Sequence, residues 1–265
     1  MTSATAAAAL VERRGHTMII TLNRPEARNA VNSALAAIVG QALEDADRDP
    51  DVRAIVITGS GGKSFCAGAD LKAISRGENV HAPGNEQWGL AGFVKHPVSV
   101  PTIAAINGMA LGGGAELALA TDLIVAEESA IFGLPEVKRG LLAGAGGLLR
   151  LPAQIPQRLA MELILTGDPI TAHQALTWGL INKVVPDGTA LEIAVALADR
   201  IAQNAPLAVQ ASKRVVLGIV GNDRREEASR WQFNDAEIAT ILTSEDAIEG
   251  PRAFAEKRAP QWLGR

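Results

Sequence analysis

Short runs of β-branched and other apolar residues recur along the first 185 positions of the chain. Most of these runs are bounded by Gly, Pro, Asn or Asp, which favour turns over regular structure. Runs of this length and composition are typical of β-strands. The pattern predicts strands at Met18–Leu22, Ala54–Thr58, Thr102–Ile106, Leu123–Ala126 and Lys183–Val185.

The segments between these runs carry helical periodicity. In residues 33–47, Leu35, Ile38, Val39 and Leu43 recur at the spacing of one helix face. The gap between the flanking strands is also long enough for a crossover connection. The sequence therefore predicts units of the ββα type and an α/β fold.

The pattern changes after Val185, where helical segments continue to the end of the chain. Thr189-Ala-Leu-Glu192 matches a capping box, in which a hydroxyl and a carboxylate satisfy free N–H groups at the start of a helix. We therefore expect a core over residues 1–205 and a helical region over residues 206–265.

Composition narrows the class of protein. The 265 residues include 25 Lys and Arg against 29 Asp and Glu, a formal charge of −4, and 48% of them are hydrophobic. This is the balance of an ordinary globular protein, and it offers no broad basic surface for nucleic acid or anionic lipid. No uninterrupted apolar run reaches the ~18 residues of a membrane span. We therefore expect neither nucleic acid nor membrane as a partner.

The single cysteine, Cys66, excludes an intramolecular disulfide and a CxxC metal or redox motif. Its neighbours Phe65 and Ala67 are apolar and no histidine is nearby, which favours a packed thiol over a nucleophile. The four histidines form no metal-ligand grouping. The alanine-rich residues 1–10 have no basic segment before them, which predicts a loose N-terminus, no signal peptide and a cytoplasmic protein.

Two glycine-rich segments, Ser64–Lys72 and Asn107–Leu117, predict turns from a strand into a helix. Small residues let another group approach the backbone there, and free N–H groups at a helix start create a partly positive site. Two such turns brought together could bind one oxygen atom that carries negative charge. A tight turn under close helix packing is an equally good interpretation of Gly112–Gly114 taken alone.

Two carboxylates lie near these turns. Glu116 falls in an apolar segment, where a carboxylate is costly unless it has a partner or a function. Glu136 follows after an intervening strand. Two carboxylates that face one pocket could divide proton transfer between them, because like charges in proximity split their pKa values. The alternatives are a solvated helix position for Glu116 and a turn or helix cap for Glu136.

At these residues the sequence resembles the enoyl-CoA hydratase/isomerase superfamily, the crotonase fold, in the order and spacing of four motifs. The resemblance covers nearly the whole chain. It implies a spiral of ββα units around a thioester-binding pocket, with C-terminal helices, here residues 206–265, that build homotrimers or homohexamers. The motifs are Phe65–Leu71, Ala105–Leu117, Phe132–Glu136 and Leu165–Asp168.

The resemblance also implies roles for individual residues. The backbone N–H groups of Ala69 and Gly113 match those that form the family's oxyanion hole for the acyl-CoA carbonyl. Lysines at the matching positions are suitable partners for CoA phosphates, with solvated surface lysines as the alternative. CoA is part of the acyl-CoA thioester substrate, so neither a separate cofactor nor a metal is expected. The residues that match CoA-binding positions are Ala69, Asp70, Leu71, Lys72 and Lys257.

Glu116 and Glu136 resemble the pair of glutamates with which the family's hydratases add water across a 2,3-double bond, so a hydro-lyase is expected. Many isomerases of the family keep only the second glutamate. Dienoyl-CoA isomerases and aroyl-CoA dehalogenases carry an aspartate where this chain has Gly144. An isomerase or hydrolase on the same fold, and a non-catalytic acyl-CoA-binding protein, are the alternatives.

Within the hydratases, Leu134–Gly140, Gly147–Pro152 and residues 244–265 resemble the carnitinyl-CoA dehydratase branch. That branch implies crotonobetainyl-CoA as substrate, with a trimethylammonium group that an aromatic face attracts. Trp88 and Phe93 are the candidate wall residues for this group. A hydrophobic lid for ordinary acyl chains is the alternative interpretation of their segment.

Overall fold

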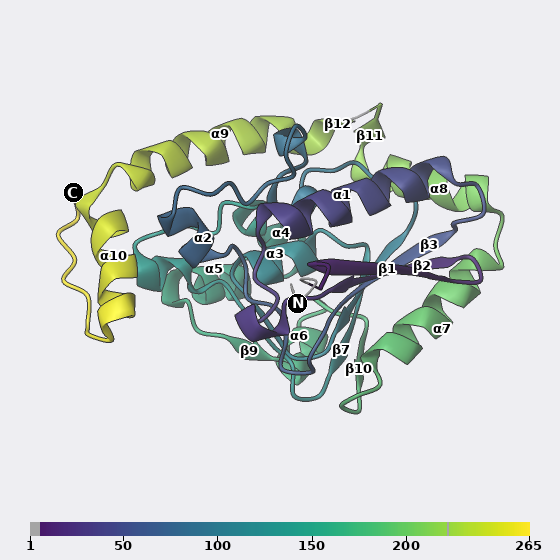
Figure 1. The fold of residues 1–265 in the computed structure, drawn as a ribbon, viewed down its shortest axis with the longest axis horizontal. Helices are drawn as coiled ribbons and strands as arrows, with labels where there is room; N and C mark the ends of the chain where they lie inside the picture. Colours follow the sequence, from purple (N-terminus) through teal and green to yellow (C-terminus); the bar gives the residue numbers. More distant parts are fainter. Residues whose placement is uncertain (1–5, 222) are drawn as a thin grey trace, which may run out of the picture.

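The structure, a computed structural model, describes residues 6–221 and 223–265 as a mixed α/β protein (Figure 1). The expected loose N-terminus falls partly on residues 1–5, which lie outside this description. The described strands form a large sheet, a small sheet and a short hairpin. In spatial order, the large sheet contains β1 (Ala9–Arg14), β2 (Thr17–Leu22), β3 (Ala54–Gly59), β5 (Thr102–Ile106), β7 (Leu123–Glu127) and β10 (Lys183–Val185).

Alternate side chains of the large sheet enter two separate cores. Ile20 and Ile57 pack in the core that contains the apolar face of α1 (Ser33–Arg48), while Ile19 and Val56 pack with α7 (Ala190–Ala202). Because both faces are covered there, the central strands β3 and β5 are buried along their whole length. The strands and the helix predicted from the sequence are confirmed, with ends that differ by at most one residue.

Successive units of the chain repeat one pattern, a strand in the large sheet followed by a strand in the small sheet. β3 and β4 (Ser64–Cys66) lead into α2 (Leu71–Ser75), and β5 and β6 (Met109–Leu111) lead into α3 (Gly113–Leu119). β7 and β8 (Ile131–Gly133) lead into the 3-10 turn η4 (Pro135–Arg139). Strands of successive units pair in parallel in both sheets, so the expected spiral of ββα units is confirmed. The small sheet contains β4 (Ser64–Cys66), β6 (Met109–Leu111), β8 (Ile131–Gly133) and β9 (Ile170–Thr171).

The remaining helices lie around the two sheets, and α10 (Glu245–Glu256) forms one end of the molecule (Figure 1). No helix within residues 6–221 and 223–265 combines the length and the apolar character needed to cross a bilayer. The remaining elements are η1 (Pro25–Ala27), η2 (Glu86–Trp88), η3 (Leu90–Gly92), α4 (Gly147–Gln154), α5 (Gln157–Thr166), α6 (Ala172–Thr177), α8 (Pro206–Leu217), β11 (Ile219–Val220), β12 (Asp223–Arg224), α9 (Arg225–Leu242) and α10 (Glu245–Glu256).

The C-terminal region folds back onto its own chain. α8 begins at Pro206, the first residue of the predicted C-terminal region, although the division into two domains stays a prediction. β11 and β12 interrupt the helices and residues 257–265 are not helical, so the expectation of helices to the end is only partly correct. α10 packs on η4 so closely that a Cβ on Gly250 would lie 2.0 Å from the Arg139 carbonyl oxygen.

The predicted capping box at the start of α7 is wrong. The Thr189 hydroxyl donates to the Pro186 carbonyl (2.6 Å), and the Glu192 carboxylate pairs with Arg14 (2.9 Å). Thr189 has a backbone in the helical range, φ −115° and ψ −5°, instead of the extended conformation typical of a capping residue. Each side chain therefore has a partner outside the helix start.

Candidate active site

The small sheet brings three segments of the chain to one place. Its strands β4, β6 and β8 are parallel neighbours, so the turns that follow them leave the same edge. The two glycine-rich turns are in direct contact there. A Cβ on Gly68 would lie 2.8 Å from the Gly113 nitrogen, and a Cβ on Gly114 would lie 1.9 Å from the Cys66 carbonyl oxygen. Side chains larger than hydrogen at these positions would push the turns apart.

In each of these turns, one backbone N–H group donates no hydrogen bond to any other group of the described chain. Gly113 is the first residue of α3, so its N–H group has no acceptor within the helix. Ala69 lies between two backbone hydrogen bonds, from Val31 to the Gly68 carbonyl (2.8 Å) and from Asp70 to the Val31 carbonyl (2.9 Å). Its own N–H group donates no hydrogen bond within the described residues. Both N–H groups are therefore free to bind an oxygen atom.

Glu116 lies one turn into α3 and is buried, with 3% of its surface exposed. Its Oε1 accepts a hydrogen bond from the Gly147 N–H group at the start of α4 (2.9 Å). Burial and the nearby Glu136 carboxylate raise the pKa of Glu116, while the N–H groups of Gly147 and Ala145 oppose this rise. The solvated position considered from the sequence is excluded.

Glu136 is in η4, directly after β8. Its Oε1 lies 3.0 Å from the position that a Cβ on Gly112 would occupy. Its Oε2 is buried and has no hydrogen-bond partner among the described residues. Burial raises the pKa of Glu136. A buried carboxyl group with a raised pKa and an unpartnered oxygen is a candidate for proton transfer.

Glu116, Glu136, Ala69 and Gly113 all line one open cavity of about 880 Å³. The cavity wall also includes side chains of α9 and α10, among them Asp235, Ile238 and Phe254. No pattern in the sequence identified these C-terminal residues as part of the site. Helical spacing was the available signal, but it does not say which helix face meets the cavity. Other apolar wall residues are Leu71, Ile74, Leu90, Val94, Leu111, Leu141 and Leu142.

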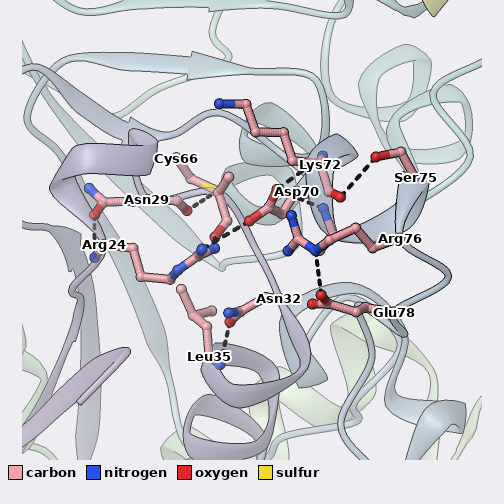
Figure 2. A network of polar contacts seen from close by, with 12 residues as sticks. Arg24, Asn29, Asn32, Leu35, Cys66, Asp70, Lys72, Ser75, Arg76 and Glu78 are labelled. Carbon is pink, nitrogen blue, oxygen red and sulfur yellow. Dashed lines mark hydrogen bonds and ion pairs between the residues drawn. The ribbon is translucent and has the colours of Figure 1, made fainter. Parts of the chain in front are cut away.

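Not all the residues that match CoA-binding positions face this cavity. Ala69 and Leu71 line it. The Asp70 carboxylate instead caps α2, accepting from the N–H groups of Lys72 and Ala73 (3.1 Å each), and pairs with Arg24 (2.9 Å) (Figure 2). The hydrogen-bonding partners of the Asp70 carboxylate thus all belong to this chain.

The two candidate lysines lie outside the cavity wall. In Figure 2 the Lys72 side chain points away from the Asp70 network, and its ammonium group has no hydrogen-bond partner among the residues drawn. Lys257 follows α10 in a left-handed backbone conformation, with φ 55°. Both residues are exposed, so their role toward CoA stays a prediction.

The prediction that Trp88 and Phe93 form the pocket wall is wrong. The Trp88 ring stacks on the His96 ring, with centroids 4.4 Å apart, and packs against Gly40 of α1. Phe93 is fully buried in the core. The segment turns both rings away from the cavity and leaves Leu90 on the cavity side.

Cys66 is a packed thiol, as the sequence predicted. Its side chain is buried, and burial raises the pKa of the thiol to about 12. The thiol donates to the Asn29 carbonyl (3.2 Å) and its sulfur accepts from the Gly68 N–H group (3.4 Å). It therefore supports the first glycine-rich turn.

Comparison with known proteins finds relatives along nearly the whole chain. A sequence model of the family described as enoyl-CoA hydratase/isomerase matches residues 12–265. The chain is 45% identical over 264 residues to the enoyl-CoA hydratase EchA19 of Mycobacterium tuberculosis, covering 97% of each chain. It is 43% identical over 259 residues to the carnitinyl-CoA dehydratase of Salmonella typhi, covering 96% of this chain and 97% of the relative.

Solved structures that are similar to this chain have the same two kinds of name as these relatives. A carnitinyl-CoA hydratase from Mycobacterium avium is 61% identical and superposes with a TM-score of 0.97, covering 98% of this chain and 100% of the other. An enoyl-CoA hydratase from Mycobacterium tuberculosis H37Rv is 48% identical, with a TM-score of 0.76 and the same coverage.

Proposed function

The chain belongs to the enoyl-CoA hydratase/isomerase family, and we propose that it is a hydro-lyase that adds water reversibly across the 2,3-double bond of an enoyl-CoA thioester. One observation carries the proposal: Glu116 and Glu136 line the same cavity as Ala69 and Gly113, whose N–H groups donate no hydrogen bond within the described residues. Water addition needs one group to accept a proton from water and one to give a proton to C2, and two carboxyl groups supply both.

The two N–H groups form the oxyanion hole in this proposal. The thioester carbonyl oxygen lies between the N–H groups of Ala69 and Gly113. When water attacks C3, the electron pair of the double bond moves toward the thioester and places enolate charge on this oxygen. Donors that are fixed before the reaction stabilise that charge most strongly in the transition state.

The glutamate pair carries the proton transfers. Burial raises the pKa of both groups, and the neighbouring carboxylate adds to the effect on Glu116, so near neutral pH the pair holds one proton. The ionised member takes a proton from water as its oxygen bonds to C3, and the protonated member gives its proton to C2. The pair again holds one proton after the reaction, and the same steps in reverse dehydrate a 3-hydroxyacyl-CoA.

We expect kcat/KM to have a bell-shaped pH profile with a maximum near neutral pH. The pKa values of Glu136 and Glu116 are raised to about 7 and about 8. The pair gains a second proton as the pH falls below the lower value and loses its last proton as the pH rises above the upper one. The measurement is kcat/KM for crotonyl-CoA between about pH 5 and about pH 10, which reports ionisations of the free enzyme. A flat profile over this range would contradict the shared proton.

We further propose that Lys72 and Lys257 contact the phosphates of CoA. The support is the direction of the Lys72 side chain, away from the Asp70 network (Figure 2). Lys72→Ala is expected to raise KM for crotonyl-CoA by about 1.5- to 5-fold at unchanged kcat, because an exposed ion pair contributes ~0.2–1 kcal/mol. Crotonyl-pantetheine lacks the phosphates, so its KM is the matched control. An equal increase for both thioesters would argue against a phosphate contact.

A second substrate candidate is crotonobetainyl-CoA, which the likeness to carnitinyl-CoA hydratases and dehydratases favours. The cavity wall contains two acidic residues, Glu86 and Asp235, in place of the Trp88 ring, and the Asp235 carboxylate pairs with Lys95 (3.2 Å). The test is the ratio of kcat/KM for crotonobetainyl-CoA to that for crotonyl-CoA. A strong preference for crotonyl-CoA would reject this substrate.

We also propose that the chain forms homotrimers or homohexamers through its C-terminal region, in the cytoplasm, where its single buried cysteine stays reduced. Large apolar side chains of this region are exposed in the single chain, including Leu207 (78%), Val215 (81%) and Phe233 (70%). Clusters of such side chains are typical of interfaces between subunits. Light scattering is expected to give three or six times the chain mass.

A further inference from the structure

Helix α9 contacts the backbone segment that holds Glu116. Within α9, all of which is described, Asn234 is the only buried residue. A helix whose one buried side chain is polar is unusual, because polar groups are buried at a cost unless they make specific hydrogen bonds. Two further contact residues, Glu227 and Trp231, precede Asn234 at the spacing of one helix face.

The contacted segment is residues 144–147. Its last N–H group, that of Gly147, donates to the Glu116 carboxylate (2.9 Å), and the Ala145 N–H group also stabilises the ionised form of Glu116. The segment is rich in glycine and includes Gly146 at φ 106°. A glycine-rich backbone has many accessible conformations, so its geometry must be fixed by what packs on it.

Asn234 fixes the first residue of this segment. Its Nδ2 donates to the Gly144 carbonyl oxygen (3.0 Å), and only 5% of the residue is exposed. One turn further along α9, the Ile238 side chain packs against the same glycine, with its Cδ1 atom 2.4 Å from the position of a Cβ on Gly144. The start of the segment thus lies against α9.

Glu227 and Trp231 fix the other end through Arg150 of α4. Glu227 accepts two hydrogen bonds from the buried Arg150 guanidinium (3.1 and 2.8 Å) and one from the Trp231 indole N–H (3.0 Å). The guanidinium also donates to the Val94 carbonyl (2.6 Å). A Cβ on Gly146 would lie 2.9 Å from Arg150 Nη1 and 3.1 Å from the Trp231 ring. The Arg150 and Trp231 side chains therefore pack closely against the backbone next to the Gly147 N–H group.

We propose that Glu227, Trp231 and Asn234, called here the α9 clamp, position the Glu116 carboxylate by fixing residues 144–147. The inference rests on the proposed hydratase function. The three side chains are positioning residues, because they act on Glu116 through the Gly147 N–H group and do not line the cavity that contains it. The C-terminal region then contributes to catalysis as well as to assembly.

Asn234→Ala tests the clamp. The variant is expected to lower kcat for crotonyl-CoA hydration by about tenfold with KM within about twofold of the original, because small misplacements of a catalytic group cost rate. Glu227→Gln keeps the side-chain size and is expected to change kcat in the same direction. Asn182→Ala is the matched control, since Asn182 also holds a backbone group, the Ile124 N–H (2.8 Å), but far along the chain from the clamp. It is expected to leave kcat unchanged.

Amide hydrogen exchange supplies a second readout. Exchange in a peptide that spans residues 142–149 is expected to be faster in Asn234→Ala than in the unchanged protein and in Asn182→Ala. A folded Asn234→Ala variant with unchanged kcat, or with unchanged exchange in this peptide, would overturn the clamp alone. A lack of turnover by the unchanged protein would instead overturn the proposed function and, with it, the catalytic role of the clamp.

Discussion

Glu116→Gln and Glu136→Gln are each expected to lower kcat for the hydration of crotonyl-CoA by about 10²- to 10⁴-fold, the usual contribution of a positioned acid or base. Either substitution leaves one titratable group where the reaction needs a proton donor and a proton acceptor. Both carboxyl groups lie in the same cavity and have raised pKa values, and the Gln amide that replaces either one neither accepts nor gives up a proton in this pH range. The measurement is the loss of the conjugated thioester absorbance over time.

The same variants carry their own folding control. The pKa of Glu116 in the folded chain is raised, so this group favours the folded state fully below its unfolded pKa and loses that contribution as the pH rises through the folded value. At about pH 8 the original protein bears the cost of a buried charge that Gln does not carry. Glu116→Gln is therefore expected to have an equal or higher Tm at this pH. Undiminished hydration by both folded variants would reject the proposed roles.

The fold could be predicted from local patterns because the large sheet is buried on both faces. Residues such as Ile19 and Ile20 point to different cores, and both must be apolar, so the central strands are mostly apolar runs in the sequence, whereas the edge strand β1 is exposed and contains charged residues. The small sheet gave a weaker signal, since its strands have only two or three residues each. Only the glycine-rich turns at the edge of the small sheet indicated where two of its strands end.

The centre of the candidate site could be predicted because its parts are close in sequence to strand ends. Gly113 and Glu116 follow β6 directly, and Glu136 follows β8. The outer wall could not be predicted in this way. Asn234 and Gly144 are joined by a hydrogen bond across 90 positions, and no local pattern indicates such a pair. Whether these two residues meet depends on the path of the chain between them.

The segment around Trp88 shows a further limit. Aromatic residues near a predicted pocket suggested a wall, but residues 86–95 contain only two short 3-10 turns, η2 and η3, which are too short for a periodicity that would indicate where each side chain points. Positive φ angles at Gly89 (73°) and Ala91 (58°) turn the backbone there. As a result Trp88 packs on α1, and Leu90 faces the cavity. Where the backbone is irregular in this way, the periodicity of the sequence does not predict the direction of each side chain.

Gly114→Ala is expected to lower kcat/KM for crotonyl-CoA by about 10²- to 10³-fold, the usual cost of losing an oxyanion-hole donor. The added Cβ would lie 1.9 Å from the Cys66 carbonyl oxygen and 2.6 Å from the carbonyl carbon. Both atoms are backbone, so a rotamer change cannot relieve the contact and the two turns must separate. The N–H groups of Ala69 and Gly113 then no longer converge on one oxygen. Overpacking of this kind is also expected to lower the free energy of unfolding by about 1–3 kcal/mol.

Gly62→Ala separates the loss of the oxyanion hole from a general loss of stability. Gly62 has φ 65° and nothing within 4 Å of the position of its Cβ, so the substitution costs about 1–2 kcal/mol of backbone strain without moving either turn. The two variants are therefore expected to unfold at similar urea concentrations while only Gly114→Ala loses activity. If the folded Gly114→Ala variant kept the original kcat/KM, contact between the two turns would not be what binds the thioester oxygen, because a Cβ cannot occupy this position while they stay together.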